Sequence, residues 1–286
     1  MAFMKIRTAV LTSAKRGHTH LPLQTMIDRE GYPQATLALQ LKELVDAGIE
    51  RVGIVVAPGQ AELYGEAMAA AADRVTFIEQ TDPRGFGDAV LRAKAFVGDA
   101  PFVLSVGDHL FVSDDPARPC AAQLVAVAER ERAPVAAVQS THESEIGLYG
   151  TIGGVLEDRD RALFRIRKIV EKPTPTQAEL ELLVPGLRSG HYLCFFGMHV
   201  LTPRIFELLE TAAADGKDGL ALTPALDRLA ETETFYAYEI AGHRYNLEER
   251  HGLLMAQMAL ALASPHRDEV LTRIVRLLAH TQSPVR

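Results

Sequence analysis

The chain has 286 residues, a formal net charge of −7, 48% hydrophobic residues and 23% charged residues, which is ordinary for a soluble globular protein. No long basic run occurs, and this argues against a nucleic-acid partner, whose binding would depend on clustered Lys and Arg. No apolar stretch approaches the ~20 residues of a membrane span. The length allows one or two domains.

Cysteine use and the first residues bear on the compartment. Only Cys120 and Cys194 occur, and they form no pattern, which indicates a reducing environment and not a disulfide framework. The opening run MAFMKIRTAVLTS has too short an apolar core for a signal peptide and no small-residue cleavage site. The sequence therefore predicts a cytoplasmic protein.

In the first half of the chain, short apolar runs alternate with segments of helical spacing. We expect strands at 6–12, 51–57, 75–79, 102–104 and 135–138, and helices at 37–47, 61–72, 88–96 and 121–132. The first of these helices ends at Gly48, a typical C-terminal position. This alternation predicts an α/β fold with a Rossmann-like, mixed, mostly parallel central sheet and helices on both faces.

The second half is less regular. It predicts a hairpin at 150–156 and 164–170, strands at 191–198 and 235–240, and helices at 177–183, 203–213, 223–231, 249–262 and 268–280. No internal repeat occurs, and no linker is long enough to separate two domains. We expect one α/β domain over residues 1–265 and a C-terminal helix over residues 266–286, which forms a helical tail.

The run PFVLSVGDHLFVSDD draws attention to Asp108. A buried strand stops just before this residue, and open α/β sheets gather their ligands at the carboxyl ends of strands. Mg²⁺ prefers one or two carboxylates together with phosphate oxygens, so Asp108 is a candidate metal ligand. The alternative is that Asp108 only caps the next turn. Asp114 and Asp115 precede Pro116, where a helix-capping role is expected.

An ordered series of short segments runs from Thr8 to about Ala263. They are the first strand with its loop, Ala47-Gly48-Ile49, Gln80 with Gly85-Phe86-Gly87-Asp88-Ala89-Val90, Val106-Gly107-Asp108, Tyr149-Gly150 and Val170-Glu171-Lys172-Pro173. Each segment is weak alone, but their order and spacing are specific, and together they resemble the sugar-1-phosphate nucleotidyltransferases. The resemblance implies the nucleotidyltransferase fold. It also implies an enzyme that joins a nucleoside triphosphate, with UTP favoured, to a sugar 1-phosphate and releases pyrophosphate.

The resemblance also implies roles for individual residues. Asp108 would bind Mg²⁺ and act in catalysis with Arg29 and Lys172. The nucleotide would meet Ala14, Lys15, Arg16, Gly17, Gln80, Gly85 and Asp108. The sugar phosphate would meet Gly150, Glu171 and Lys172, where a point cation suits a dianionic monoester. Solvated turns are the alternative for Glu171 and Lys172, and a bond to its own loop is the alternative for Gln80. Homo-oligomers are common in this family.

The chain departs from the family pattern at two places. The family's first loop is Gly-rich, of the form G-x-G-T-R, but here Lys15 takes the place of the first Gly and Thr19 that of the Arg. The family's later Pro-Lys pair is Asp28-Arg29, so that a cation remains at Arg29. Near the end of the chain, Asn246 stands where the family has a second metal-binding carboxylate. An Asn can still offer its carbonyl oxygen to Mg²⁺, and Glu248 lies nearby.

These departures leave three functional hypotheses. The first is an active nucleotidyltransferase with an altered triphosphate loop. The second is a catalytically impaired relative that binds a nucleotide sugar or sugar phosphate as a sensor or partner subunit. The third is a glycosyltransferase on a similar scaffold, for which Asp114 and Asp115 are poorly placed as the acidic pair. A zinc site at His18-x-His20 is a remote alternative. We favour the first.

Overall fold

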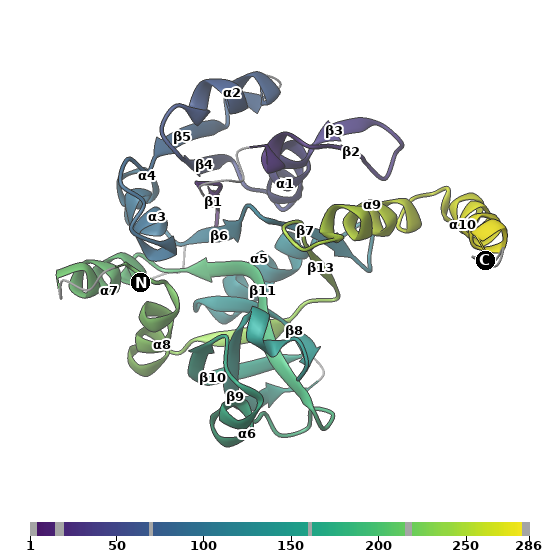
Figure 1. The fold of residues 1–286 in the computed structure, drawn as a ribbon. Helices are drawn as coiled ribbons and strands as arrows, with labels where there is room; N and C mark the ends of the chain where they lie inside the picture. Colours follow the sequence, from purple (N-terminus) through teal and green to yellow (C-terminus); the bar gives the residue numbers. More distant parts are fainter. Residues whose placement is uncertain (1–4, 15–19, 69–70, 160–161, 215–218, 282–286) are drawn as a thin grey trace.

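A computed structural model describes residues 5–14, 20–68, 71–159, 162–214 and 219–281 (Figure 1). Its strands are β1 Thr8–Thr12, β2 Thr25–Ile27, β3 Pro33–Ala35, β4 Arg51–Val56, β5 Val75–Glu79, β6 Phe102–Val106, β7 His109–Ser113, β8 Val135–His142, β9 Gly150–Asp158, β10 Leu163–Glu171, β11 His191–Leu201, β12 Tyr236–Glu239 and β13 Gly242–Asn246. Its α-helices are α1 Thr36–Asp46, α2 Gln60–Ala67, α3 Phe86–Arg92, α4 Lys94–Val97, α5 Cys120–Glu131, α6 Pro175–Glu181, α7 Arg204–Ala214, α8 Thr223–Thr232, α9 Gly252–Leu262 and α10 Arg267–Thr281.

The described strands form a central sheet of nine in the order β5-β4-β1-β6-β11-β8-β12-β10-β9. Strands β5, β4, β1 and β6 pair in parallel, and β8 pairs in parallel with β12. Strand β11 runs antiparallel to β6 and β8, and β10 runs antiparallel to β12 and β9. Only β11 and β10 therefore run against the other described strands of this sheet. The expected mixed, mostly parallel α/β sheet is confirmed.

Two apolar cores lie on the two faces of this sheet. One face packs against α3, α7 and α8, with Phe102, Phe206 and Leu226 at its centre. The opposite face packs against α1, α2 and α5. Phe102 and Phe206 stack with ring centroids 5.3 Å apart. A sheet covered on both faces needs continuous apolar strands, and this is why β4 and β6 carry almost no polar residues.

A smaller sheet pairs β7 with β13 in antiparallel register, so that His109 lies opposite Asn246. Helix α9 covers this pair through an apolar cluster that includes Leu110, Leu247 and Leu260. The sequence predicted neither β7 nor β13, because their pairing joins segments about 130 residues apart and no local pattern reports it. The short hairpin of β2 and β3 was also not predicted.

Several expected boundaries are wrong. The helix expected at 61–72 spans Gln60–Ala67, and the one expected at 88–96 is divided into α3 and α4 around Ala93. Asp115 does not cap α5, whose N-cap is Pro119; its carboxylate instead accepts a hydrogen bond from the Ala117 amide at 2.9 Å within the preceding turn. The expected helix end near Gly48 is confirmed, with a positive φ of 88° there.

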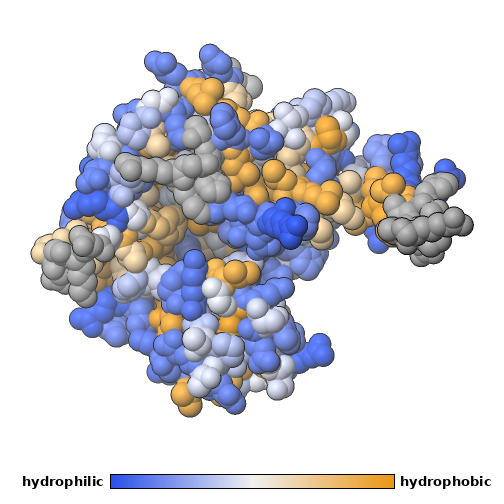
Figure 2. Space-filling model, viewed as in Figure 1, coloured by the Kyte–Doolittle hydropathy of each residue, from blue (hydrophilic) through white to orange (hydrophobic). Residues whose placement is uncertain are grey.

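The chain ends in two helices. Helix α9 lies against β13, whereas α10 projects from the body of the molecule (Figure 1). Apolar residues gather over α9 in Figure 2, and Val275, Leu277 and Leu278 of α10 are exposed. In the described part of the chain, none of the helices has the length and apolar character needed to cross a membrane. The division into a domain over 1–265 and a separate terminal helix stays a prediction.

Glu43 of α1 lies at the start of α5. Its carboxylate accepts a hydrogen bond from the Ala121 amide at 2.8 Å. Burial raises the pKa of Glu43 to about 7, although the amides of Cys120 and Ala121 and the positive charge of Arg29 act in the opposite direction. Burial outweighs these contacts because removing a charged carboxylate from water costs more free energy than removing a neutral carboxylic acid.

This raised pKa makes folding stability depend on pH. A group whose pKa is higher in the folded state stabilises the fold below its unfolded pKa, and this contribution is lost as the pH rises through about 7. Glu43→Gln does not ionise, so the variant should gain about 2 kcal/mol relative to the native chain between pH 5 and pH 8. Urea unfolding at several pH values measures this difference. Glu50→Gln, at an exposed carboxylate paired with Arg7, is the control and should run parallel to the native chain. Parallel pH profiles for the native chain and Glu43→Gln would contradict the prediction.

Candidate active site

A cavity of about 930 Å³ opens at the carboxyl ends of β1 and β6. The segment that follows β1, the start of α3 and the start of α8 wall it, together with the ends of β9 and β10. This volume lies within the range of small-molecule and cofactor sites. Open α/β sheets bind ligands at the carboxyl ends of their strands, so the position and the size of the cavity agree.

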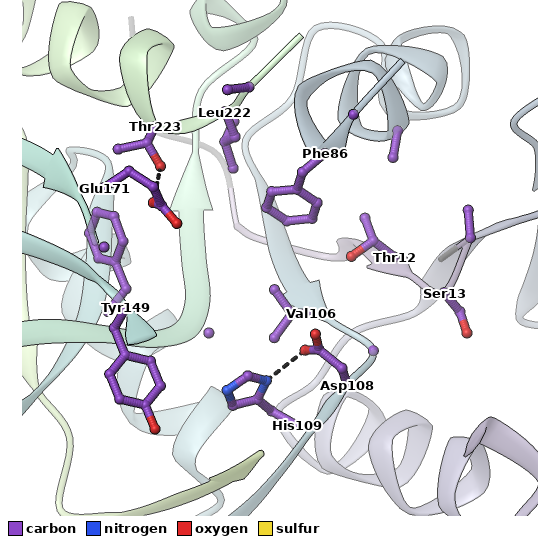
Figure 3. A pocket seen from close by; sticks show the side chains of 18 of the residues that line it. Thr12, Ser13, Phe86, Val106, Asp108, His109, Tyr149, Glu171, Leu222 and Thr223 are labelled. Atoms are coloured by element: carbon purple, nitrogen blue, oxygen red, sulfur yellow. Dashed lines mark hydrogen bonds and ion pairs between the residues drawn. The ribbon is translucent and has the colours of Figure 1, made fainter. Parts of the chain in front are cut away.

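Asp108 lines this cavity, and Figure 3 shows its carboxylate beside the His109 ring. One of its carboxylate oxygens lies 2.6 Å from Nδ1 of His109. The backbone oxygen of Asp108 accepts a hydrogen bond from the Leu247 amide at 2.9 Å. Asn246 therefore lies beside Asp108, and both line the cavity. The structure thus brings together the two residues that the sequence proposed as metal ligands.

One wall carries the residues expected to meet the nucleotide. Gln80 is buried at the end of β5, and its amide nitrogen donates to Asp88 Oδ2 at 2.7 Å and to the Gly85 oxygen at 3.2 Å. Gly85 has a φ of 120°, and a Cβ there would lie 2.7 Å from the Leu220 oxygen. With both amide hydrogens engaged, Gln80 can offer a ligand only its carbonyl oxygen.

The opposite wall, called the sugar wall below, carries the residues expected to meet the sugar phosphate. Gly150 pairs with Glu171 across β9 and β10, and the Thr223 hydroxyl donates to Glu171 Oε2 at 2.6 Å. Figure 3 shows Glu171 and Thr223 facing the cavity across from Phe86. A Cβ on Gly150 would lie 2.6 Å from the Phe195 ring, so only glycine fits there.

Lys172 follows Glu171 and also lines the cavity. Its backbone has a φ of 48°, which is uncommon for a residue other than glycine, and its amide donates to the Tyr149 oxygen at 3.1 Å. Strained residues of this kind cluster at binding and catalytic sites, where the surrounding structure holds them in place. Gly150, Glu171 and Lys172 therefore form one continuous surface of the cavity.

Arg244 of β13 supports this wall from behind. Its guanidinium carbon lies 3.8 Å from the centroid of the Tyr149 ring, and its nitrogens donate to Thr141 Oγ1 at 3.0 Å and Gln139 Oε1 at 3.3 Å. A guanidinium stacked on an aromatic face attracts it electrostatically. Because Asn246 is two residues further along β13, Arg244 joins the sugar wall to the pair of strands that carries Asp108 and Asn246.

The first loop is covered only in part. Ala14 is buried and lines the cavity, in agreement with its expected place. Lys15, Arg16 and Gly17 lie outside the described residues, as do His18 and Thr19. Arg29 does not line the cavity; its guanidinium donates to the Ser113 oxygen at 3.4 Å. The structure does not bring Arg29 together with Asp108 and Lys172, and its catalytic role stays a prediction without support from this geometry.

Several cavity residues were missed by the sequence reasoning. His109 and Thr223 line the cavity. Phe86, which the sequence places in a family segment without a role, and Glu248, a sequence neighbour of Asn246, also line it. His109 follows Asp108 directly, and this adjacency was a usable signal. Thr223 had none, because it reaches Glu171 from a helix 52 residues further along the chain. Asp114 and Asp115 do not line the cavity, so they make no acidic pair for a glycosyltransferase there.

The donors in the cavity suit a hard cation such as Mg²⁺. The carboxylates of Asp108 and Glu248 and the amide of Asn246 all supply oxygen. Within the described ranges, no three His, Cys, Asp or Glu side chains lie close enough to hold a metal ion by themselves. Mg²⁺ usually takes one or two carboxylates and completes its shell with water and substrate phosphates, so two carboxylates and one amide oxygen are a suitable set of donors.

Comparison with known proteins gives the family. The nucleotidyl transferase model matches residues 32–242. The UTP–glucose-1-phosphate uridylyltransferase of Streptococcus pneumoniae serotype 4 is 31% identical over 300 aligned positions, which cover 96% of this chain and 96% of the relative. The enzyme of the same name from Streptococcus pyogenes is 29% identical and covers 96% of this chain and 95% of the relative.

Solved structures agree on the fold. A UDP-glucose pyrophosphorylase complexed with UDP-glucose superposes with a TM-score of 0.73 at 22% identity, over 89% of this chain and 98% of that one. The UTP-bound enzyme from Acinetobacter baumannii gives 0.74 at 22% identity, over 95% and 99%. These likenesses, the family match and the ordered segments around the cavity lead to one conclusion: the chain belongs to the nucleotidyl transferase family.

Proposed function

We propose that the chain is a UTP–glucose-1-phosphate uridylyltransferase. In this reaction a phosphate oxygen of glucose 1-phosphate bonds to the α-phosphorus of UTP. The bond from that phosphorus to the bridging oxygen breaks, and pyrophosphate leaves, so that UDP-glucose remains. The observation that carries the proposal is the 31% identity over 96% of the chain to a relative with this name. The cavity supports it, because its two walls carry the residues expected for the two substrates.

The residues of the cavity have separate roles in this proposal. The carbonyl oxygen of Gln80 accepts a ring N–H such as that of uracil, because both amide hydrogens are bound elsewhere. Gly150 lets the sugar approach the backbone, and Glu171 accepts from its hydroxyl groups. Lys172 neutralises the attacking phosphate. Such a reaction is accelerated by positioning and charge stabilisation more than by acid–base groups.

We also propose Mg²⁺ as the cofactor, held by Asp108, Asn246 and Glu248. Mg²⁺ bound there would neutralise charge on the phosphates. An amide at position 246 contributes no charge, so Glu248 supplies the second carboxylate. The remaining expectations also belong to this proposal: the chain works in the cytoplasm on small phosphorylated substrates, without nucleic acid or membrane, in agreement with its net charge of −7.

A pyrophosphate-release assay tests the reaction. The purified protein, with Mg²⁺, is given UTP, CTP, GTP, ATP or dTTP against a panel of sugar 1-phosphates. We expect turnover to be fastest with UTP and glucose 1-phosphate. Asp108→Asn keeps the shape of the side chain but removes its charge, and it should lower kcat at least a hundredfold, or about 2.7 kcal/mol of transition-state stabilisation. Turnover that survives in Asp108→Asn would contradict the role of Asp108.

The second candidate is a catalytically impaired relative that only binds a nucleotide sugar or sugar phosphate. Asn246 favours this candidate, because the family has a carboxylate at that position. Calorimetry with UDP-glucose distinguishes the two. Absence of turnover with every substrate pair, together with measurable binding of UDP-glucose, would overturn the enzyme and support the sensor or partner subunit.

The role of Glu248 is tested by metal binding. Mn²⁺ is titrated into the protein with UTP, and electron paramagnetic resonance measures the free ion. Glu248→Gln removes a charged oxygen donor from the cavity and should weaken Mn²⁺ binding about tenfold. Glu249→Gln is the matched control, since Glu249 lies outside the cavity with its carboxylate 3.4 Å from the Tyr149 hydroxyl. Equal Mn²⁺ affinities in the two variants would contradict the role of Glu248 as a metal ligand.

We propose further that the chain forms a homo-oligomer through α10. The exposed Val275 and Leu278 lie on a helix that projects from the body, and exposed apolar patches mark interaction sites. Light scattering should give a mass that is a multiple of 31.2 kDa. Val275→Glu with Leu278→Glu should reduce it to one chain, whereas Arg276→Glu on the same helix should not. A native mass of one chain would contradict this assembly.

A further inference from the structure

His199 of β11 is a polar group in an unusual place. It lines the cavity, yet only 4% of its surface is exposed. Its Nδ1 atom is buried and has no hydrogen-bond partner among the residues that the structure describes. A buried polar atom left without a hydrogen-bond partner destabilises the fold, and native structures rarely contain one without a use.

The surroundings of His199 are apolar. Its partners on the neighbouring strands are Leu104 of β6 and Ala136 of β8, and the Phe195 ring meets the imidazole edge to face at 4.7 Å between centroids. Burial alone lowers the pKa of His199 to about 4. The ring is therefore neutral near pH 7, with one nitrogen that donates a hydrogen bond and one that accepts.

The strand is built to place this side chain. The pairing of β11 with β8 shifts between Phe195 and His199, and Gly197 between them has a φ of 104°. Residues four apart in a regular strand lie about 13 Å from each other, so the two rings meet only because the strand is irregular. Irregularities of this kind re-aim side chains beside active sites.

His199 also lies next to the sugar wall. A Cβ on Gly150 would lie 2.6 Å from Cδ2 of Phe195 and 3.1 Å from Oε2 of Glu171. Phe195 in turn contacts His199. A continuous series of contacts therefore runs from Glu171 through Gly150 and Phe195 to His199, so that His199 lies close to the expected sugar contacts.

We propose that His199 determines sugar specificity, with Nδ1 forming a hydrogen bond to one hydroxyl group of the bound sugar. This inference rests on the proposed function, which supplies the sugar. In apolar surroundings, a sugar that lacks this hydroxyl leaves Nδ1 without a partner, and a site of this kind discriminates strongly against such an analogue. The Phe195 ring, which meets the imidazole, offers no substitute partner.

Binding measurements with modified ligands test this contact. Calorimetry compares UDP-glucose with its 2-, 3-, 4- and 6-deoxy analogues, on the native protein and on His199→Phe. The native protein should lose about tenfold in affinity for one analogue in particular. His199→Phe should bind UDP-glucose about tenfold more weakly and should lose nothing further with that same analogue. UTP, which lacks the glucose of UDP-glucose, should bind both proteins equally.

Two further variants separate a specific contact from a structural effect. Asn places a polar atom close to the position of Nδ1, so His199→Asn should restore part of the discrimination. Met198→Leu changes the neighbouring residue, which is buried in the core on the opposite face of the sheet, and should behave like the native protein. The ¹⁵N resonance of Nδ1 in the native protein should also shift when UDP-glucose is added, which tests the contact without any substitution.

The outcomes distinguish this inference from the proposed function. If the native protein and His199→Phe discriminate equally against every analogue, or if the Nδ1 resonance does not shift, Nδ1 binds only water and the inference is overturned while the function stands. If UDP-glucose binds without any turnover, the proposed reaction fails and the comparison of analogues still decides the role of His199. If no UDP-glucose binds, both fall.

Discussion

The pairing of β7 with β13 is the constraint on which the site depends. The hydrogen bond from the Leu247 amide to the Asp108 oxygen, at 2.9 Å, fixes two segments that are more than 130 residues apart. Without it, Asp108 would stand alone at the end of β6, as one strand-end carboxylate. With it, Asn246 and Glu248 reach the same cavity, and Arg244 reaches Tyr149 from the same strand. One short ladder thus couples the proposed metal ligands to the wall expected to bind the sugar.

The two walls of the cavity differ in how firmly their side chains are held. Gln80 is buried and bound to Asp88, whose side chain also faces Arg84 and Arg92, each at 3.5 Å. The opposite wall relies on the exposed Glu171, which Thr223 holds from a separate helix. A buried polar network with charged partners is rigid, whereas a contact between exposed side chains is easily exchanged. This difference suits the proposed roles, in which the wall with Gln80 binds the base and the wall with Glu171 binds the sugar.

Much of the fold could be predicted because its signals are local. The apolar runs that became β4 and β6, the helix that ends before Gly48 and the hairpin of β9 and β10 all carry their own patterns. Asp108 could be placed because the end of a buried strand is visible in the sequence. The ladder of β7 and β13, the contact of Thr223 and the irregularity at Gly197 could not, because each depends on the pairing of distant segments.

Arg29 shows the limit of a resemblance taken position by position. Aligning it with a family cation made it a catalytic candidate, but its guanidinium bonds the Ser113 oxygen and its charge acts on Glu43, outside the cavity. Conversely, His199 carries no motif, yet its burial and its unpartnered Nδ1 mark it physically. A motif shows where a residue lies along the chain. A buried polar atom without a partner instead indicates a contact that the folded protein can still make with a ligand.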